Sequence, residues 1–210
     1  MNKDNIILCF CKHPEEGFVK SRLAKDIGAR RATEIYKILL DITLQNISNF
    51  GSKIILYCHP NINHPILEDY RDMYSLMLKK QYDGDDDLGI KMHQAIKEHL
   101  DNNTNVVLIG SDCLEIDATY IQQAFEKLNL DNEVVLGPTK DGGYALIGVN
   151  KLNISIFQGI NWSSNQVLQQ TKDKASKLNW NVSCLPIIRD LDLLDDYEYF
   201  SNHEKYCHLF

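Results

Sequence analysis

Val106-Val107-Leu108-Ile109-Gly110-Ser111-Asp112 is the stretch that decides the fold, because an apolar run ends here in a glycine, a hydroxyl and a carboxylate. A run without polar alternation predicts a strand that is buried on both faces, as in a parallel sheet covered by helices. Open α/β sheets bind ligands at the carboxyl ends of their strands, so Gly110 and Ser111 are candidate nucleotide- or phosphate-binding residues. Asp112 suits a divalent cation shared with phosphate oxygens. Ser and Asp also commonly begin helices, and this stretch alone leaves both interpretations open.

Further apolar runs alternate with helical patterns along the chain. Strands are predicted at residues 6–11, 53–58, 76–81, 106–110, 133–137, 144–149 and 182–188. Helices are predicted at residues 29–49, 66–74, 87–100, 117–128 and 163–178, with a short helix near Asp195. This alternation predicts an α/β fold, a three-layer sandwich with a mostly parallel central sheet. We expect residues 1–210 to form a single domain, because no repeat, low-complexity tract or linker divides them.

The composition is that of an ordinary globular protein, with 44% hydrophobic and 24% charged residues among 210. Acidic residues outnumber basic ones by 29 to 22, which argues against nucleic acid as a partner because such binding needs a basic surface. The first apolar run, residues 6–10, is too short for a signal peptide or a membrane span, so we expect a cytoplasmic protein that binds no membrane. The six cysteines lack the spacing of a zinc or redox site, and we expect most to be reduced and buried. Composition does not predict an oligomeric state.

The loop after the first predicted strand, residues 12–23, combines turn-forming residues with cations. Lys12, Lys20 and Arg22 could neutralise a diphosphate, the lysines as point charges and the arginine as a forked donor. Most charge clusters are simply solvated surface. Phosphate binding is nevertheless our preferred interpretation, because the loop and Asp112 should lie at the same edge of the sheet.

An acidic turn, Asp83-Gly84-Asp85-Asp86-Asp87, closes the third predicted strand. It is not a calcium loop, because a helix follows at once and the terminal glutamate is missing. Asp87 either caps that helix or contacts the base or ribose of a nucleotide.

The loop at residues 137–144 joins two predicted strands and contains adjacent glycines, Gly142 and Gly143. Two glycines permit either a tight hairpin or a backbone that passes close to a ligand. Asp141 is a candidate general base if this loop faces Asp112. We therefore interpret the glycines as candidate acceptor-binding residues.

Aromatic and acidic side chains later in the chain could complete the site. Tyr144 and Trp162 could form flat walls against an acceptor, although aromatic residues are more often part of a core. Asp190 and Asp192 stand on alternate positions and point the same way, so either could complete a metal site with Asp112. Asp192 is the preferred second ligand, and it could equally cap the terminal helix.

Four segments in register carry a family resemblance. They are F-x-K-x-P-x-x-G-x-V-K-S-R-L at residues 10–23, G-S-D-C at 110–113, G-P-x-x-D-G-G-Y at 137–144 and I-x-W-S-S-x-x-V at 160–167. Together they resemble the selenodomain-associated transferase family, bacterial proteins predicted to be glycosyltransferases with a GT-A, nucleotide-diphospho-sugar transferase fold.

The resemblance implies sugar transfer from a nucleotide-diphospho-sugar donor to a small acceptor, with Mg²⁺ or Mn²⁺ as cofactor. It implies that Lys20 and Arg22 approach the donor phosphates, that Asp112 is a metal ligand, and that the loop around Asp141 borders the acceptor.

Two alternative functions stay open. The chain also resembles phospholactate guanylyltransferase, a nucleotidyltransferase of the same fold with a K-S-R-L loop and a D-L-G-like turn. In that reaction a phosphorylated acceptor attacks the α-phosphorus of GTP or CTP, and pyrophosphate leaves. The third possibility is a non-catalytic nucleotide-binding protein.

Overall fold

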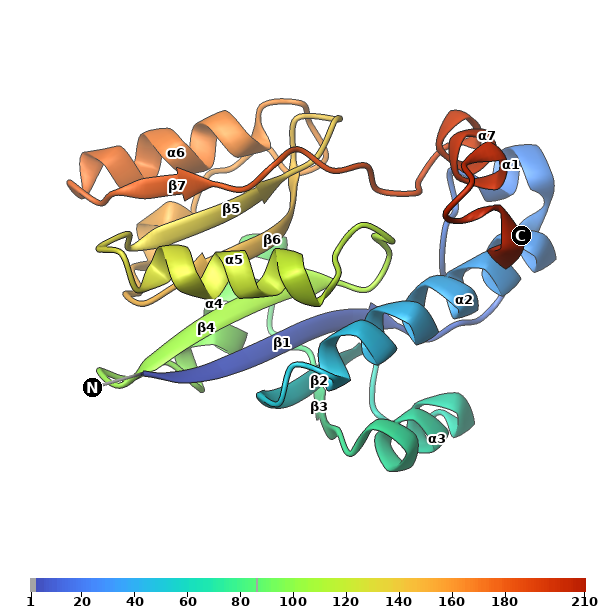
Figure 1. The fold of residues 1–210 in the computed structure, drawn as a ribbon, viewed down its shortest axis with the longest axis horizontal. Coiled ribbons are helices and arrows are strands. Elements are labelled where there is room, and N and C mark those ends of the chain that lie inside the picture. Colours follow the sequence, from blue (N-terminus) through green and yellow to red (C-terminus); the bar gives the residue numbers. More distant parts are fainter. Residues whose placement is uncertain (1–2, 86) are drawn as a thin grey trace.

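A seven-stranded sheet runs through the part of the chain that the computed structural model describes, residues 3–85 and 87–210 (Figure 1). The strands are β1 (Asp4–Lys12), β2 (Lys53–His59), β3 (Met77–Lys80), β4 (Thr104–Gly110), β5 (Val134–Pro138), β6 (Tyr144–Val149) and β7 (Val182–Cys184). They lie in the order β3-β2-β1-β4-β6-β5-β7. β6 is antiparallel to β4 and β5, and the other neighbours are parallel, so the predicted α/β fold with a mostly parallel sheet is confirmed.

Helices cover both faces of this sheet. They are α1 (Ala24–Ile27), α2 (Ala29–Ser48), α3 (Pro65–Tyr74), α4 (Leu88–Lys97), α5 (Ala118–Leu128), α6 (Val167–Lys177) and α7 (Leu194–Asn202), with short 3-10 turns η1 (Ile154–Ile156) and η2 (Cys207–Leu209). Successive side chains of a strand point to opposite faces. Accordingly, Ile7 and Cys9 of β1 join a core with residues of α2 and α5, whereas Ile6 and Leu8 join a second core with residues of α4 and α6.

A third core joins the two ends of the described chain. Leu23 and residues of α2 pack with Leu191 and with Phe200 of α7, and Figure 1 shows α7 beside α1. The segment between β7 and α7 therefore passes the carboxyl edge of the sheet, where it carries Asp190 and Asp192.

Several predicted elements end earlier or begin later than expected, among them the helix predicted at residues 87–100, which ends at Lys97. The helix predicted at residues 163–178 begins at Val167, because Ser163 has a φ of 66°, which a helix cannot accommodate. The strand predicted at 182–188 ends at Cys184. Pro186 follows shortly after and lacks the N–H that a strand donates, although Ile188 still forms an isolated bridge with Thr139.

The cysteines behave mainly as small apolar residues. All six are free thiols, and Cys9, Cys11, Cys58 and Cys113 are buried. Burial raises the pKa of the Cys113 thiol, which is therefore protonated at neutral pH. The prediction that most cysteines are reduced and buried is confirmed.

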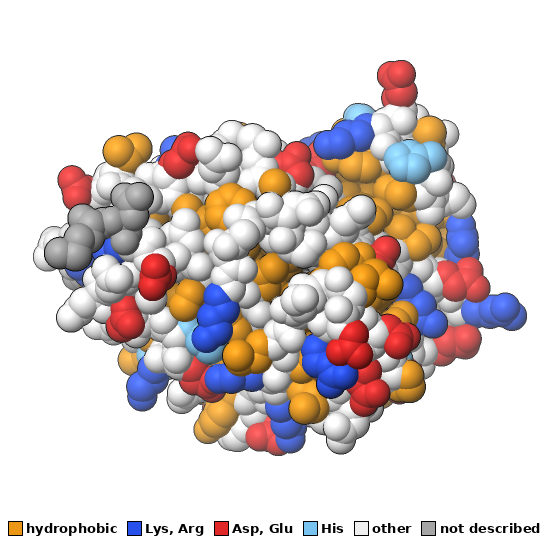
Figure 2. Space-filling view, turned by 60° about the horizontal axis from the view of Figure 1, so that its bottom comes forward, with side chains coloured by type: hydrophobic (Ala, Val, Ile, Leu, Met, Phe, Trp, Pro, Cys, Tyr) orange, Lys and Arg blue, Asp and Glu red, His pale blue; other side chains and the backbone are white. Residues whose placement is uncertain are grey.

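Charged side chains of both signs share the face seen in Figure 2, where Lys and Arg are interspersed with Asp and Glu. Within residues 3–85 and 87–210, no helix has the combination of length and apolar character that crossing a membrane requires.

Candidate functional site

The loop after β1 and the end of β4 meet through an ion pair. Lys20 donates from Nζ to Oδ2 of Asp112 over 2.8 Å. The Lys20 side chain is 2% exposed and that of Asp112 is 43% exposed, so the ammonium is enclosed while the carboxylate faces a cleft. Burial by itself would raise the pKa of the Asp112 carboxyl, but the charge and hydrogen bond of Lys20 outweigh burial and lower it. Asp112 is therefore ionised at neutral pH, and the loop lies at the same edge of the sheet as Asp112, as predicted.

Buried neighbours hold Lys20 in an uncommon backbone conformation. Its φ is 49°, a region that residues other than glycine adopt infrequently. Val19 and Leu23 on either side are 3% and 0% exposed, which anchors the loop to the cores. Such a conformation persists only where the surroundings fix it, so the ammonium is placed before any ligand arrives.

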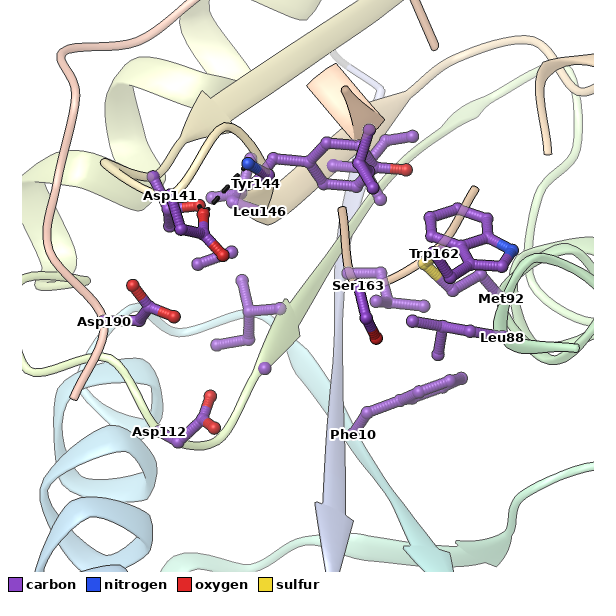
Figure 3. A pocket seen from close by; sticks show the side chains of 18 of the residues that line it. Phe10, Leu88, Met92, Asp112, Asp141, Tyr144, Leu146, Trp162, Ser163 and Asp190 are labelled. Carbon is purple, nitrogen blue, oxygen red and sulfur yellow. Dashed lines mark hydrogen bonds between the residues drawn. The ribbon is translucent and has the colours of Figure 1, made fainter. Parts of the chain in front are cut away.

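Three carboxylates face one cavity. Figure 3 shows Asp112, Asp141 and Asp190 on one side of this inner cavity. Burial and, next, the negative charge of Asp141 raise the pKa of Asp190 to about 6, and Asp112 adds to the effect. The arrangement concentrates negative charge and offers the hard oxygen atoms that Mg²⁺ and Mn²⁺ prefer.

The turn between β5 and β6 fixes the position of Asp141. Its Oδ1 accepts hydrogen bonds from the Thr139 hydroxyl over 2.5 Å and from the Gly143 N–H over 2.9 Å. Gly142 has a φ of 89°, and a Cβ at this position would lie 2.2 Å from the carbonyl oxygen of Asn165. Glycine is therefore required here, as the close approach of backbone to backbone demands.

The inner cavity has a volume of about 240 Å³, and an outer cavity of about 590 Å³ shares part of its lining. Opposite the carboxylates, the inner cavity is lined by Phe10, Leu88, Met92 and Trp162 (Figure 3). The residues that line the outer cavity include the predicted phosphate-binding cations Lys12, Lys20 and Arg22, together with Gly110, Ser111 and Asp192. Asp112, Asp141 and Asp190 line both cavities, so cationic and apolar surfaces meet at these carboxylates.

Asp190 and Asp192 differ in their surroundings. Asp192 accepts a hydrogen bond from Nη1 of Arg22 over 2.9 Å, and its other oxygen lies 4.0 Å from Nζ of Lys20. Asp190 instead lies near the charges of Asp141 and Asp112. The N-cap of α7 is Leu193, so the interpretation of Asp192 as the cap of that helix is wrong.

Asp87 caps α4 by accepting a hydrogen bond from the N–H of Ile90 over 3.0 Å, so the cap interpretation is confirmed. The same oxygen lies 3.3 Å from Nε1 of Trp162, which donates to it. Asp87 thereby holds the indole at the edge of the inner cavity. Asp86, in the same acidic turn, lies outside the described residues.

Some residues of the cleft carried no sequence signal. The hydroxyl of Tyr36 accepts a hydrogen bond from the N–H of Lys12 over 2.9 Å and lies 2.8 Å from Oγ of Ser111. It thereby joins the loop after β1 to the end of β4. Tyr36 lies on the inward face of α2, where the apolar pattern predicts only core packing. Thr139 and Phe10 were also not predicted to belong to the site.

The middle of the chain matches a known family. Residues 43–164 fit a family described as "Uncharacterized protein conserved in bacteria (DUF2064)", and this match covers more than half of the chain. The chain belongs to this family. No curated protein has significant sequence similarity to this DUF2064 protein.

Several solved structures share the fold of this DUF2064 protein. One, from Desulfovibrio desulfuricans G20, is provisionally assigned as a nucleotide-diphospho-sugar transferase. Its sequence is 28% identical to this chain and the TM-score is 0.85. The match covers 100% of this chain and 94% of the Desulfovibrio chain. The 4-diphosphocytidyl-2C-methyl-D-erythritol synthase of Anaerococcus prevotii is 12% identical with a TM-score of 0.60, over 94% and 96% of the two chains.

A third similar structure is the glucosyl-3-phosphoglycerate synthase of Mycobacterium tuberculosis, in complex with Mn²⁺, UDP and glucosyl-3-phosphoglycerate. It is 8% identical with a TM-score of 0.57, over 94% of this chain and 75% of its own. At such low identity the second and third likenesses show the fold alone. The predicted nucleotide-diphospho-sugar transferase fold and the family resemblance are confirmed.

Proposed function

We propose that this DUF2064 protein is a metal-dependent glycosyltransferase that uses a nucleotide-diphospho-sugar donor and a small acceptor. One observation carries the proposal: the enclosed ammonium of Lys20 meets Asp112 at 2.8 Å, where a cationic cavity joins a cavity with apolar walls. The likeness to the Desulfovibrio protein supports the same transferase class.

The outer cavity is the proposed place of the donor diphosphate. Lys20 contributes a fixed, enclosed charge, whereas Lys12 and Arg22 are exposed and can adjust to the phosphates. The guanidinium of Arg22 donates to the carboxylate of Asp192. It can donate to a phosphate oxygen instead, because carboxylate and phosphate oxygens accept hydrogen bonds from the same N–H groups of an arginine. The role proposed for Asp192 is therefore to orient Arg22, beside its predicted role as a metal ligand.

Asp112 and Asp190 are the proposed ligands of Mg²⁺ or Mn²⁺. Asp190 is a better partner than Asp192 because it lines both cavities with Asp112, whereas Asp192 lines only the outer one and already accepts a hydrogen bond from Arg22. When bound, such an ion supplies positive charge that stabilises the departing diphosphate. It would also offset the crowding of negative charge around Asp190.

Asp141 is the proposed general base. In a single displacement, the acceptor hydroxyl gives its proton to Asp141, its oxygen bonds to the sugar carbon, and the bond from that carbon to the diphosphate oxygen breaks. The hydrogen bonds from Thr139 and Gly143 occupy Oδ1 of Asp141. Oδ2 is then the atom for the proton. Tyr144 and Trp162 are proposed to border the acceptor on the apolar side.

The experiment is a turnover assay that follows release of nucleoside diphosphate from UDP-, GDP-, CDP- and dTDP-sugars with Mn²⁺. Donors for the assay are first chosen by thermal shift, since a ligand of the folded state raises apparent stability. We expect turnover with at least one donor, lost in Asp141→Asn while donor binding is retained. Turnover that survives in Asp141→Asn contradicts the role of that residue.

A nucleotidyltransferase is the second candidate, favoured by the three cations around the outer cavity, which could also neutralise a triphosphate. The two reactions leave different products. Pyrophosphate release from a nucleoside triphosphate supports the second candidate, and nucleoside diphosphate release from a nucleotide sugar supports the first. Binding without turnover across both panels would instead favour the non-catalytic alternative.

A further inference from the structure

His13, Glu15 and His64 form a compact cluster outside the cleft. Oε1 of Glu15 lies 3.8 Å from Nδ1 of His13 and 3.7 Å from Nε2 of His64. The two imidazole rings are 4.9 Å apart between centroids. Within residues 3–85 and 87–210, this is the only group of three or more His, Cys, Asp or Glu residues whose possible ligand atoms all lie within 4.8 Å of one another.

The hydrogen bond on the far side of His13 fixes where its lone pair points. Nε2 of His13 lies 2.8 Å from the carbonyl oxygen of Asn61. A carbonyl oxygen only accepts, so Nε2 must carry the proton, and in the neutral ring Nδ1 presents its lone pair to Glu15. A lone pair facing a carboxylate is unfavourable, and either a proton on Nδ1 or a metal cation between the two groups relieves the repulsion. A ring N–H donating to a backbone carbonyl is also the usual outer support of a metal-bound histidine.

The side chains of His13 and His64 are enclosed, whereas Glu15 is accessible. The exposed fractions are 6% for His13, 16% for His64 and 53% for Glu15. Nδ1 of His64 is buried without a hydrogen-bond partner among the described residues, whereas Nε2 lies 3.7 Å from Oε1 of Glu15, so Nε2 is the nitrogen that can share an ion with Glu15. Two rings held in place and one movable carboxylate allow an ion to enter from solvent.

We propose that His13, Glu15 and His64 bind a zinc-class transition metal, with a fourth position left for water. Two imidazoles and one carboxylate suit Zn²⁺ rather than Mg²⁺, and tetrahedral ligands about 2.0–2.1 Å from the metal stand roughly 3.4 Å apart. The contacts of 3.7 and 3.8 Å to Glu15 therefore need to shorten by only a few tenths of an ångström, and the two imidazole nitrogens, which lie within 4.8 Å of each other, must also approach.

An ion bound by the cluster would connect two segments of the chain. His13 and Glu15 belong to the loop that carries Lys20, and His64 is the N-cap of α3. A metal bound to all three would link the loop after β1 to the start of α3. The site is separate from the carboxylates at Asp112, and it does not depend on the proposed function.

The test is titration of the metal-free protein with ZnCl₂ alone by calorimetry, with a parallel Co²⁺ titration followed by absorption. Glu15→Gln and His64→Gln remove one ligand each. Glu16→Gln is the matched control, because Glu16 is an exposed carboxylate next to Glu15 and outside the cluster. Melting curves of the metal-free variants establish that each is folded, which is expected for Glu15→Gln because the side chain is largely exposed.

We expect one Zn²⁺ per chain in the wild type and in Glu16→Gln, with a rise in melting temperature. In Glu15→Gln and His64→Gln, affinity falls about 100-fold or more and the rise disappears. The Co²⁺ complex should show the absorption of nitrogen and oxygen ligands. The proposal is overturned if the wild type binds no Zn²⁺, if Glu15→Gln binds as tightly as Glu16→Gln, or if Co²⁺ shows thiolate ligands.

Discussion

Replacing Asp190 by Asn should stabilise the metal-free protein, because it removes a carboxylate whose ionised form is disfavoured first by burial and then by the negative charge of Asp141. The pKa of Asp190 is raised from 3.8 to about 6, so its folded-state pKa lies above its unfolded value. Such a group stabilises the fold fully below pH 4, and this contribution is lost as the pH rises through 6. A pKa difference of one corresponds to about 1.4 kcal/mol, so the full difference corresponds to roughly 3 kcal/mol. Because Asp190 is partly exposed, solvent screening reduces the expected gain for Asp190→Asn at pH 7 to about 1–2 kcal/mol.

The measurement is urea unfolding of metal-free wild type and Asp190→Asn at several pH values between 4 and 7. The difference in unfolding free energy should be small at pH 4 and reach its full value above pH 6. Asp173→Asn is the control, because it removes an exposed carboxylate on α6 that only accepts from Gln169. An Asp190→Asn protein that is no more stable than the wild type at pH 7 would refute the reasoning that burial and the charge of Asp141 make the ionised form of Asp190 costly.

Three other perturbations test different parts of the site. Gly142→Ala should lower the unfolding free energy by about 2–3 kcal/mol in urea titrations, because φ is 89° and a backbone oxygen lies 2.2 Å from the new Cβ. A loss below about 0.5 kcal/mol would contradict the requirement for glycine at this position. Lys20→Met should weaken pyrophosphate binding at least tenfold by calorimetry and leave Asp112 unpaired, whereas an unchanged affinity would remove Lys20 from the phosphate site. In Trp180→Phe, which keeps Trp162, donor binding should change the indole fluorescence, since Trp162 lines the inner cavity; no change at saturation would place the ligand elsewhere.

Much of the fold followed from local sequence pattern. The uninterrupted apolar run of β4 predicted a buried strand, and Asp117 was correctly expected at the start of α5, where it accepts from the N–H of Tyr120 over 2.9 Å. The ends of elements were harder to predict, because the left-handed conformation of Ser163 depends on the loop that precedes α6. That loop is held by tertiary contacts, which no local pattern records.

The convergence of the cationic loop and Asp112 was also predictable, because parallel strands end at one edge of the sheet. The choice between Asp190 and Asp192 was not. Alternation along an extended segment predicts equivalent orientations, but Arg22 engages Asp192 in the outer cavity, whereas Asp190 lines the inner cavity as well. The cluster of Glu15 with two histidines was missed as well, since the contact between Glu15 and His64 depends on how two loops pack.

The most direct test of whether Lys20 and Asp112 form one site for a diphosphate and its metal ion is to locate bound Mn²⁺ and nucleoside diphosphate by anomalous diffraction from a co-crystal. We expect an Mn²⁺ peak in contact with the carboxylate of Asp112, with the diphosphate against Nζ of Lys20. A diphosphate bound away from Lys20, or no Mn²⁺ peak at Asp112 in the presence of the nucleotide, would contradict the roles proposed for Lys20 and Asp112.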